Sequence, residues 1–475
     1  MSQPSQRLYS SWSSTRPSVD RSPGTIGPLE TAVDGVAGRD RVVDGIREIL
    51  AGAFIAVVAV SVCLEVSIGG RLALAEALLL LALPWLVVSL RPKLDRTAWL
   101  LLAAAAIWLS ALVLTDVVRG TEFRDFIRGW ARIGFLVVDF LALYWLLTTP
   151  RRFLVWLLAF SVGVGLKAAL VHQDPGTQWK FGLAAGAFFA SAAVVLLASR
   201  SSGRPGAPLS SATLDLLGLL TLAATAVSLA LNARSSALAF LLAGMLVLTC
   251  RSEALRRTLG GWVTRHVWVV AILAVVALYG VGRTYIAATE AGLLGEEARS
   301  RLQMQTLDAA DPVVGLIGGG RGEFFASVRA IADSPVIGHG SWARSAEYYG
   351  IYVDSLRRMG SEYMAMLAEY VGRRDGHVLP THSHVLGAWV EAGLAGAAFW
   401  LLVAVTLVRA GVRALPNPTA LGIVILCALP AQMWALAFSP LGADSRLFWA
   451  LLLVSCCRIL AADERPRPTG LFAQP

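Results

Sequence analysis

The stretch Leu379-Pro-Thr-His-Ser-His-Val-Leu-Gly-Ala-Trp-Val-Glu-Ala-Gly-Leu-Ala-Gly396 decides how this chain is organised. It begins with the polar, titratable residues His382, Ser383 and His384 and continues into a segment apolar enough to cross a bilayer. Small residues then recur about four positions apart, a spacing that lets a neighbouring helix approach closely. The stretch therefore predicts an imidazole at a membrane surface, held on the end of a tightly packed helix.

The composition places the whole chain in a membrane. Of its 475 residues, 56% are hydrophobic and only 15% are charged, whereas about a quarter of a soluble protein is charged. The net charge of +9 is spread in short basic clusters between hydrophobic spans, so we expect no nucleic-acid partner. All five cysteines lie in or beside apolar spans, so neither a disulfide framework nor a cysteine-based zinc site is expected.

Apolar spans of transmembrane length follow one another along the sequence. They lie near 49–68, 73–90, 98–118, 130–148, 153–171, 181–199, 213–231, 235–250, 266–282, 384–408, 418–437 and 445–461. These spans predict an all-α, polytopic integral membrane protein with about twelve transmembrane helices. The predicted parts are a disordered tail over 1–47, nine spans over 48–282, a large loop over 283–383, three spans over 384–461 and a tail over 462–475.

The basic residues of short loops predict the orientation, since such residues stay on the cytoplasmic side. One set of alternate loops carries Arg91, Lys93, Arg96, Arg151, Arg152, Arg200, Arg204, Arg251, Arg256, Arg257, Arg265, Arg409 and Arg413, and the tails belong with it through Arg458, Arg465 and Arg467. Both termini are therefore expected in the cytoplasm, and the loop 283–383 is expected on the outer, periplasmic side.

One outer segment, just before the fourth span, departs from this rule with Arg119, Arg124, Arg128 and Arg132. Arginines on the outer side indicate an anionic ligand there, and the alternative is that they snorkel to lipid headgroups. Arg128 and Arg132 are accordingly candidates for a supporting role in binding.

The long loop is expected to fold into a small helical cap. Residues Arg321–Ala332 carry an apolar stripe at helical spacing, and a second helical stretch is expected over about 353–371. A loop of about 100 residues is much longer than an ordinary connection, and loops of that length are usually functional.

Several motifs together resemble the O-antigen ligase and O-antigen polymerase family of membrane glycosyltransferases. The first is His382, Ser383, Leu386, Glu391, Gly393 and Gly396, in which Ser383 stands where many members have Asn. The second is Arg234 followed by a small residue, and the third is Arg321 before an amphipathic helix and the Pro335, Gly338, Gly340 turn. Ala233 replaces the usual Ser before Arg234, and Phe324 or Phe325 replaces the usual Trp after Arg321.

The resemblance implies a GT-C-like fold and an inverting glycosyltransferase in the bacterial inner membrane, with its active site facing the periplasm. The donor would be a glycan on undecaprenyl diphosphate, and the acceptor lipid A core for a ligase or another glycan for a polymerase. His382 would be the general base, because an imidazole can take a proton from a hydroxyl. Arg234 and Arg321 would bind the donor diphosphate, because a guanidinium presents a planar fork to phosphate. Neither a metal nor another cofactor is implied.

Other interpretations of the same residues stay open. His382 could cap the helix or bind the cap, His384 could at most support it, and His339 and His377 could complete a three-histidine zinc site. Glu391, Gly393 and Gly396 are expected to organise helix packing, and the charges in the spans, Glu65, Glu76, Asp139 and Lys167, mark either a path or buried pairs. The rival class is a transporter or flippase for a polysaccharide or a lipid-linked substrate, for which about twelve helices would be ordinary.

Overall fold

The computed structural model describes residues 45–67, 71–90, 93–201, 209–231, 233–306, 311–318, 321–360 and 362–464. The chain divides into two units, Met1–Ala51 and Gly52–Pro475, and the account below concerns the second. The predicted tails, 1–47 and 462–475, fall outside the described residues except at their inner ends, where 45–47 and 462–464 are helical.

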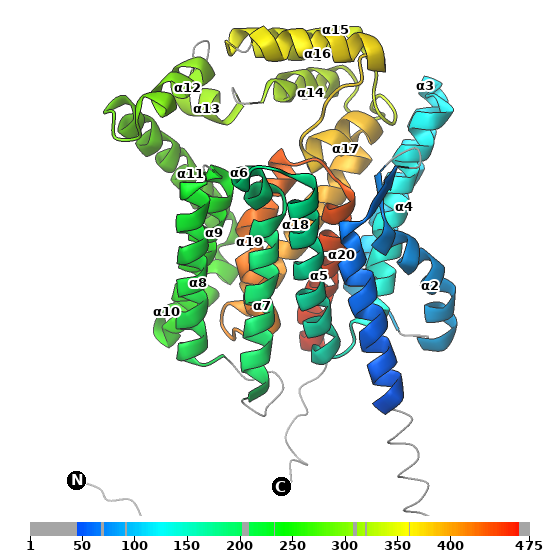
Figure 1. The fold of residues 1–475 in the computed structure, drawn as a ribbon, viewed down its shortest axis with the longest axis vertical. Helices are drawn as coiled ribbons and strands as arrows, with labels where there is room; N and C mark the ends of the chain where they lie inside the picture. The colour runs from blue at the N-terminus through cyan, green and yellow to red at the C-terminus, as the bar shows by residue number, and fades with distance from the viewer. Residues whose placement is uncertain are drawn as a thin grey trace, which may run out of the picture. The chain divides into compact units, whose positions relative to one another are not determined.

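The described residues are almost entirely helical, as Figure 1 shows. A short antiparallel hairpin pairs Glu65 with Ala73 and Ser67 with Arg71. The elements in order are η1 (Ser61–Cys63), β1 (Glu65–Ser67), β2 (Arg71–Ala73), α2 (Leu74–Leu90), α3 (Arg96–Arg119), α4 (Phe123–Leu146), α5 (Pro150–Val171), α6 (Pro175–Gln178), η2 (Trp179–Leu183), α7 (Ala184–Ser201), α8 (Ser211–Ala230), α9 (Arg234–Arg251), α10 (Glu253–Arg265), α11 (Val267–Glu290), α12 (Glu296–Thr306), α13 (Pro312–Gly318), α14 (Gly322–Asp333), α15 (Ala346–Arg358), α16 (Glu362–Asp375), α17 (His384–Ala392), α18 (Leu394–Ala414), α19 (Ala420–Phe438) and α20 (Ala443–Glu464).

Eight helices of the described part are long and apolar enough to cross a membrane. They are Gly45–Cys63, Arg96–Arg119, Pro150–Val171, Pro175–Ser199, Ser211–Ala230, Arg234–Arg251, Leu394–Ala414 and Ala420–Phe438. The other four predicted spans coincide with α2, α4, α11 and α20, so the total of about twelve stays a prediction. The chain is an all-α protein of the multi-pass membrane class.

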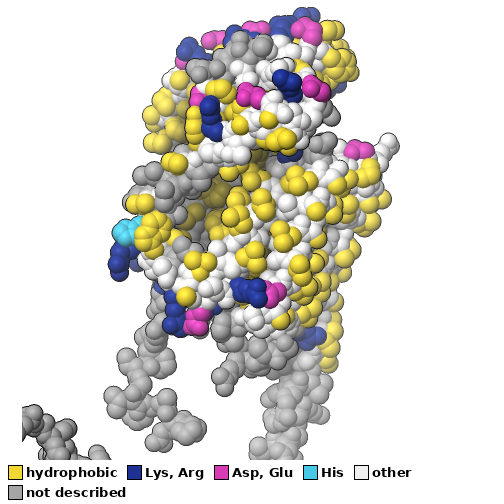
Figure 2. Space-filling model, turned by 90° about the vertical axis from the view of Figure 1, so that its left-hand side faces the viewer, with side chains coloured by type: hydrophobic (Ala, Val, Ile, Leu, Met, Phe, Trp, Pro, Cys, Tyr) yellow, Lys and Arg dark blue, Asp and Glu magenta, His cyan; other side chains and the backbone are white. Residues whose placement is uncertain are grey.

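The surface agrees with that class. In the view of Figure 2, hydrophobic side chains cover the middle of the described surface, and most of the charged side chains gather above and below it. Exposed large apolar residues are numerous on the long helices, and they include Leu81, Trp85, Trp99, Leu114 and Val162. Such side chains are costly in water and ordinary against lipid tails.

The predicted span 384–408 is wrong as a single helix, because the structure breaks it at Gly393 into α17 and α18. Gly393 has φ +66° and Gly338, in the loop opposite, has φ +82°. A Cβ on Gly393 would lie 1.9 Å from the Val336 carbonyl oxygen, and one on Gly338 would lie 2.6 Å from the Gly393 nitrogen. The two backbones therefore touch at a seam between the loop and the helix break.

The predicted helix 353–371 is also wrong as one element, because the chain turns at Met359 and Gly360 and divides it into α15 and α16. The helix predicted over Arg321–Ala332 corresponds to α14. Helices α12 to α16 lie beyond the ends of the long helices in Figure 1. We refer to α14, α15, α16 and the loop Ser334–Ser345 as the cap.

The arginines near 119–132 are on helices and not in a loop. Arg119 ends α3, and α4 begins at Phe123, so Arg128 and Arg132 lie in its first turns. Arg119 donates to the Gly338 carbonyl at 2.8 Å and to Ser334 Oγ at 2.7 Å. This arginine therefore fastens the cap to the end of α3 instead of reaching for lipid.

Candidate functional site

A cavity of about 820 Å³ lies between the cap and the ends of the long helices. Its walls are mostly apolar and aromatic, and its polar lining residues are Arg71, Arg128, Arg132, Asp375, Thr381, His382, Ser383, His384, Glu391 and Arg446. A concave, largely apolar cavity with a few convergent polar groups is the usual form of a small-molecule or lipid site. We call it the central cavity.

The cap is positioned over this cavity by charged residues of the α3–α4 corner. Asp116 accepts hydrogen bonds from the Ser341 nitrogen at 2.6 Å and from Ser341 Oγ at 2.7 Å. Arg344 binds Asp125 with Nε at 2.7 Å and with Nη2 at 2.6 Å. Because Asp116 and Asp125 are buried, these contacts are strong and fix the cap loop.

Glu391 forms the next part of the cavity wall. It pairs with Arg132 and accepts a hydrogen bond from the Trp342 nitrogen at 3.3 Å. The Gly340 nitrogen donates to the Glu391 carbonyl at 3.0 Å. In this geometry Glu391 joins α4, α17 and the cap, and its structural role stays a prediction.

Gly393 and Gly396 are both positions of close approach. Gly393 forms the seam with Gly338, and a Cβ on Gly396 would lie 2.3 Å from the Ala388 carbonyl oxygen. The close neighbour of Gly396 is thus the preceding helix, α17, and not a distant one. Both glycines are needed where the chain turns from α17 into α18.

His382 lies at the cavity beside a carboxylate from the cap. Its Nδ1 is 3.2 Å from Glu323 Oε1, and its side chain is 49% exposed. Burial alone would raise the pKa of Glu323, but the hydrogen bond from His382 and the charge of Arg321 lower the pKa below its usual value. An ionised Glu323 holds the proton on Nδ1 and leaves the His382 Nε2 lone pair available as a base.

Ser383, and not His382, caps α17. Its Oγ accepts from the Leu386 nitrogen at 3.1 Å and donates to the Leu436 carbonyl at 2.9 Å. The interpretation of His382 as a helix cap is therefore wrong, because its neighbour already satisfies the end of the helix. The contact of His382 with Glu323 of α14 shows that His382 does bind the cap.

His384 lines the same cavity. It is 3% exposed, packs edge to face on Trp400 and Trp449, and has Nδ1 2.5 Å from the Ser439 carbonyl oxygen. A carbonyl only accepts, so Nδ1 carries the proton, and Nε2 has no hydrogen-bond partner among the described residues. Nε2 of His384 is therefore a second unprotonated imidazole nitrogen at this site.

Arg128 and Arg132 both line the cavity, but their partners differ. Arg132 is neutralised by Glu391. The Arg128 guanidinium lies 4.6 Å over the Trp342 ring and 3.8 Å from Asp125, which already binds Arg344. The Nε atoms of Arg128 and Arg132 both lack a hydrogen-bond partner in the described part of the chain, so the two side chains differ in their ion pairs and not in this donor.

Arg321 is not among the residues that line the central cavity. It precedes α14, donates to the Phe438 carbonyl and places its guanidinium 5.0 Å from the Phe438 ring centroid. Burial lowers its pKa, and the charge of Glu323 opposes that shift. The charge of Arg321 thus favours the ionised form of Glu323, which contacts His382.

Arg234 is placed elsewhere. It starts α9, is exposed, and donates from Nη1 to the Tyr285 hydroxyl of α11 at 2.6 Å. It is not among the residues that line the central cavity. The structure therefore does not bring Arg234 and His382 together around one cavity.

Three residues of the site were missed by the sequence analysis: Arg71, Glu323 and Arg446. Glu323 stands two residues after Arg321, and that proximity in the sequence was the available signal. Arg71 is the basic residue between the first two spans, on the side expected to be outer, and it was passed over. Arg446 lies in a predicted span and gave no local signal.

The other loop histidines are engaged away from the cavity. His339 Nε2 lies 2.7 Å from the Ala330 carbonyl oxygen, and His377 packs against Tyr349. Within the described ranges, no group of three or more His, Cys, Asp or Glu residues could hold a metal ion.

Comparison of the chain with protein-family models, curated proteins and solved structures produced no match. The fold and the site together define the class, a multi-pass helical membrane protein with a capped cavity that is lined by histidines and arginines. The more specific assignment depends on the chemistry of that cavity.

Proposed function

We propose that the protein is an inverting glycosyltransferase that moves a glycan from undecaprenyl diphosphate to an acceptor hydroxyl on the outer face of the inner membrane. The observation that carries the proposal is the His382–Glu323 pair at a capped cavity that also presents arginines. The setting is surface polysaccharide assembly, with a ligase or a polymerase as the two forms of the activity.

The reaction needs a base, and His382 supplies it. The acceptor hydroxyl gives its proton to His382 Nε2 as its oxygen attacks the anomeric carbon. The bond between that carbon and the diphosphate oxygen breaks on the opposite face, so the configuration inverts and the diphosphate leaves with the electron pair. Glu323 fixes the ring and balances the imidazolium charge, as the carboxylate of a catalytic triad does.

The charge that grows on the departing diphosphate needs cationic partners in a site that excludes water. Arg128 lines the cavity with an Nε donor that has no partner among the described residues, and the charge of Arg321 acts on Glu323, the partner of His382. Arg234 keeps its predicted role only as a more distant contact with the donor, since its described partner is Tyr285.

The test is glycan transfer from a lipid diphosphate donor by the purified protein, with EDTA present and with candidate acceptors supplied separately. Wild-type transfer that is lost in a folded His382→Ala variant supports the proposal, and the acceptor that works distinguishes ligase from polymerase. Equal transfer by His382→Ala and wild type would remove His382 as the base, and the His384→Ala variant then tests the second imidazole.

The second candidate is a transporter or flippase for a lipid-linked substrate. It is favoured by charges within the predicted spans, where Lys167 pairs with Glu65 and Asp444 and Arg446 pairs with Glu76. Because these charges are paired, they suit a fixed scaffold better than a moving path. Lipid movement between leaflets without any transfer, measured in proteoliposomes, would favour this candidate.

A further inference from the structure

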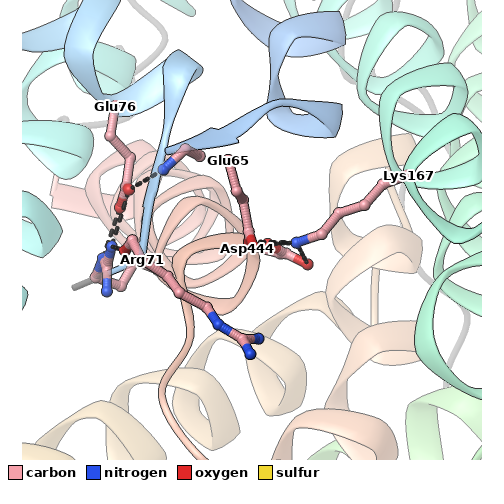
Figure 3. A network of polar contacts seen from close by, with 7 residues as sticks. Glu65, Arg71, Glu76, Lys167 and Asp444 are labelled. Atoms are coloured by element: carbon pink, nitrogen blue, oxygen red, sulfur yellow. Dashed lines mark hydrogen bonds and ion pairs between the residues drawn. The ribbon is translucent and has the colours of Figure 1, made fainter. Parts of the chain in front are cut away.

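The hairpin β1–β2 carries an arginine whose backbone is held tightly and whose side chain is free. Arg71 begins β2, pairs through its backbone with Ser67 and lines the central cavity. Its guanidinium makes no hydrogen bond or ion pair with any described residue. In Figure 3 the Arg71 side chain extends away from Glu76, and no contact is drawn at its tip.

The backbone of this hairpin is fixed by two groups of charges, one partly buried and one buried. At the β1 side, Lys167 of α5 binds Glu65 and also binds Asp444 at 2.7 Å. Lys167 and Asp444 are 16% and 35% exposed, so the pair is only partly screened by solvent. The first strand is therefore tied to α5 and to the start of α20.

The second group acts on β2 itself. Arg446 of α20 binds Glu76 through Nε at 2.6 Å and Nη2 at 2.8 Å. Glu76 also accepts from the Ala73 nitrogen at 2.9 Å, and Arg446 Nη2 lies 3.4 Å from the Arg71 carbonyl oxygen. Glu76 is fully buried and Arg446 is 6% exposed, so this double contact is strong and holds the strand that carries Arg71.

The four arginines of the cavity therefore divide into two kinds. Arg132 is paired with Glu391 and Arg446 with Glu76, whereas Arg128 shares Asp125 with Arg344, and Arg71 makes no ion pair with any described residue. Of the two lining carboxylates, Glu391 is paired with Arg132, and Asp375 binds Arg374. The unpaired charge that faces the cavity is thus positive.

We propose that Arg71, together with Arg128, is a preorganised anchor for the phosphate group of an amphiphilic ligand in the central cavity. A guanidinium fork matches two phosphate oxygens, and a backbone that is already fixed loses little entropy on binding. The largely apolar and aromatic walls favour the rest of an amphiphile. The inference rests on the proposed function only for the choice between a lipid diphosphate donor and a phosphorylated acceptor.

The test is a binding measurement on the full-length protein in nanodiscs, without any transfer reaction. One arm uses a polyprenyl diphosphate that carries no glycan, and the other uses a water-soluble sugar phosphate. Arg71→Gln should raise the Kd of the recognised probe by about 10-fold, as expected for loss of a charge-assisted contact. Arg358→Gln, the same change at an exposed arginine outside the cavity, should leave the Kd unchanged.

The outcomes separate this inference from the proposed function. Weaker binding of the polyprenyl probe assigns Arg71 to the donor, and weaker binding of the sugar phosphate alone assigns it to the acceptor. Unchanged binding of both probes by Arg71→Gln, or no binding of either by the wild type, would overturn the inference. Wild-type binding that depends on Arg71, with no transfer to any acceptor, would leave the inference standing and defeat the glycosyltransferase proposal.

If Arg71→Gln does not fold, a second variant, Arg71→Lys, tests the same residue. Arg71→Lys keeps the charge and loses the planar fork, so the Kd should rise by about 3-fold. Two results together would contradict the role of Arg71: binding by Arg71→Lys equal to that of the wild type, and weaker binding by Arg128→Gln. The phosphate anchor would then be Arg128 alone.

Discussion

The two regions that the sequence marked with arginines turn out differently. Around the central cavity, Arg128 and Arg132 lie with His382, His384 and Glu391 under the cap. At the start of α9, Arg234 is exposed and meets a tyrosine hydroxyl. The difference shows that an arginine near a membrane surface becomes part of a polar site only where segments distant in the sequence meet around it. Here those segments are α4, α17 and the cap.

The sharpest test of this comparison is catalytic. His382→Ala should lower kcat for glycan transfer by about 10²-fold or more, since general base catalysis typically contributes 10²- to 10⁴-fold. Arg234→Ala should lower it far less. Steady-state transfer by both purified variants measures the contrast, and a larger loss in Arg234→Ala would move the centre of the site to α9.

The second test compares ion pairs of the same two regions by stability. Glu391→Gln leaves the largely buried Arg132 without its carboxylate, and we expect a loss of about 2–3 kcal/mol in the free energy of unfolding. Asp215→Asn breaks the exposed Asp215–Arg251 pair of α8 and α9 and should cost less than about 1 kcal/mol. Thermal unfolding in detergent measures both, and equal losses would mean that the pair at the cavity is no more than a surface contact.

The third test compares three arginines, Arg128, Arg321 and Arg234, by the effect of their substitution on transfer. Arg128→Gln should reduce kcat/KM for transfer by about 10-fold, which corresponds to about 1.4 kcal/mol. Arg321→Ala should lower turnover by at least about 10-fold. Arg234→Gln should have the smallest effect of the three, and an effect as large as that of Arg128→Gln would show that the donor extends to α9.

The smallest effect is a pH dependence of stability at Glu323. A carboxyl whose pKa is lowered in the folded protein stabilises it above the unfolded pKa, about 4.3, and loses that contribution as the pH falls through the folded value. The difference in unfolding temperature between wild type and Glu323→Gln should therefore be present at pH 7 and vanish in strong acid. A difference that grows as the pH falls would contradict an ionised Glu323.

The periodic parts of this fold could be predicted from the sequence, and the contacts between distant residues could not. Apolar runs predicted the places of the long helices, because burial in lipid acts on every residue of a span, but α4 begins seven residues before its predicted span and α11 ends eight residues after its own. The break at Gly393 was missed because α17 and α18 are both apolar and the cause of the break, the loop at Gly338, lies 55 positions away.

The candidate site shows the same division. His382 and Arg128 were singled out by residue type and by the side of the membrane expected for them. Glu323 and Arg446 acquire meaning only through partners 59 and 370 positions away, which no local pattern encodes. The placement of Arg234 depends on Tyr285, which the sequence analysis did not single out.

The seam between Gly338 and Gly393 has a mechanical consequence. Hinges need backbone dihedral angles that are free to change, and at this seam both backbones are locked against each other at positive φ. The seam therefore allows no hinge motion, and the cap and α17 are expected to move together as one rigid body. A disulfide engineered elsewhere around the cavity rim would restrict any motion of the cap that the seam permits. A disulfide beside Gly338 and Gly393 would restrict no further motion, because the two backbones are already fixed there.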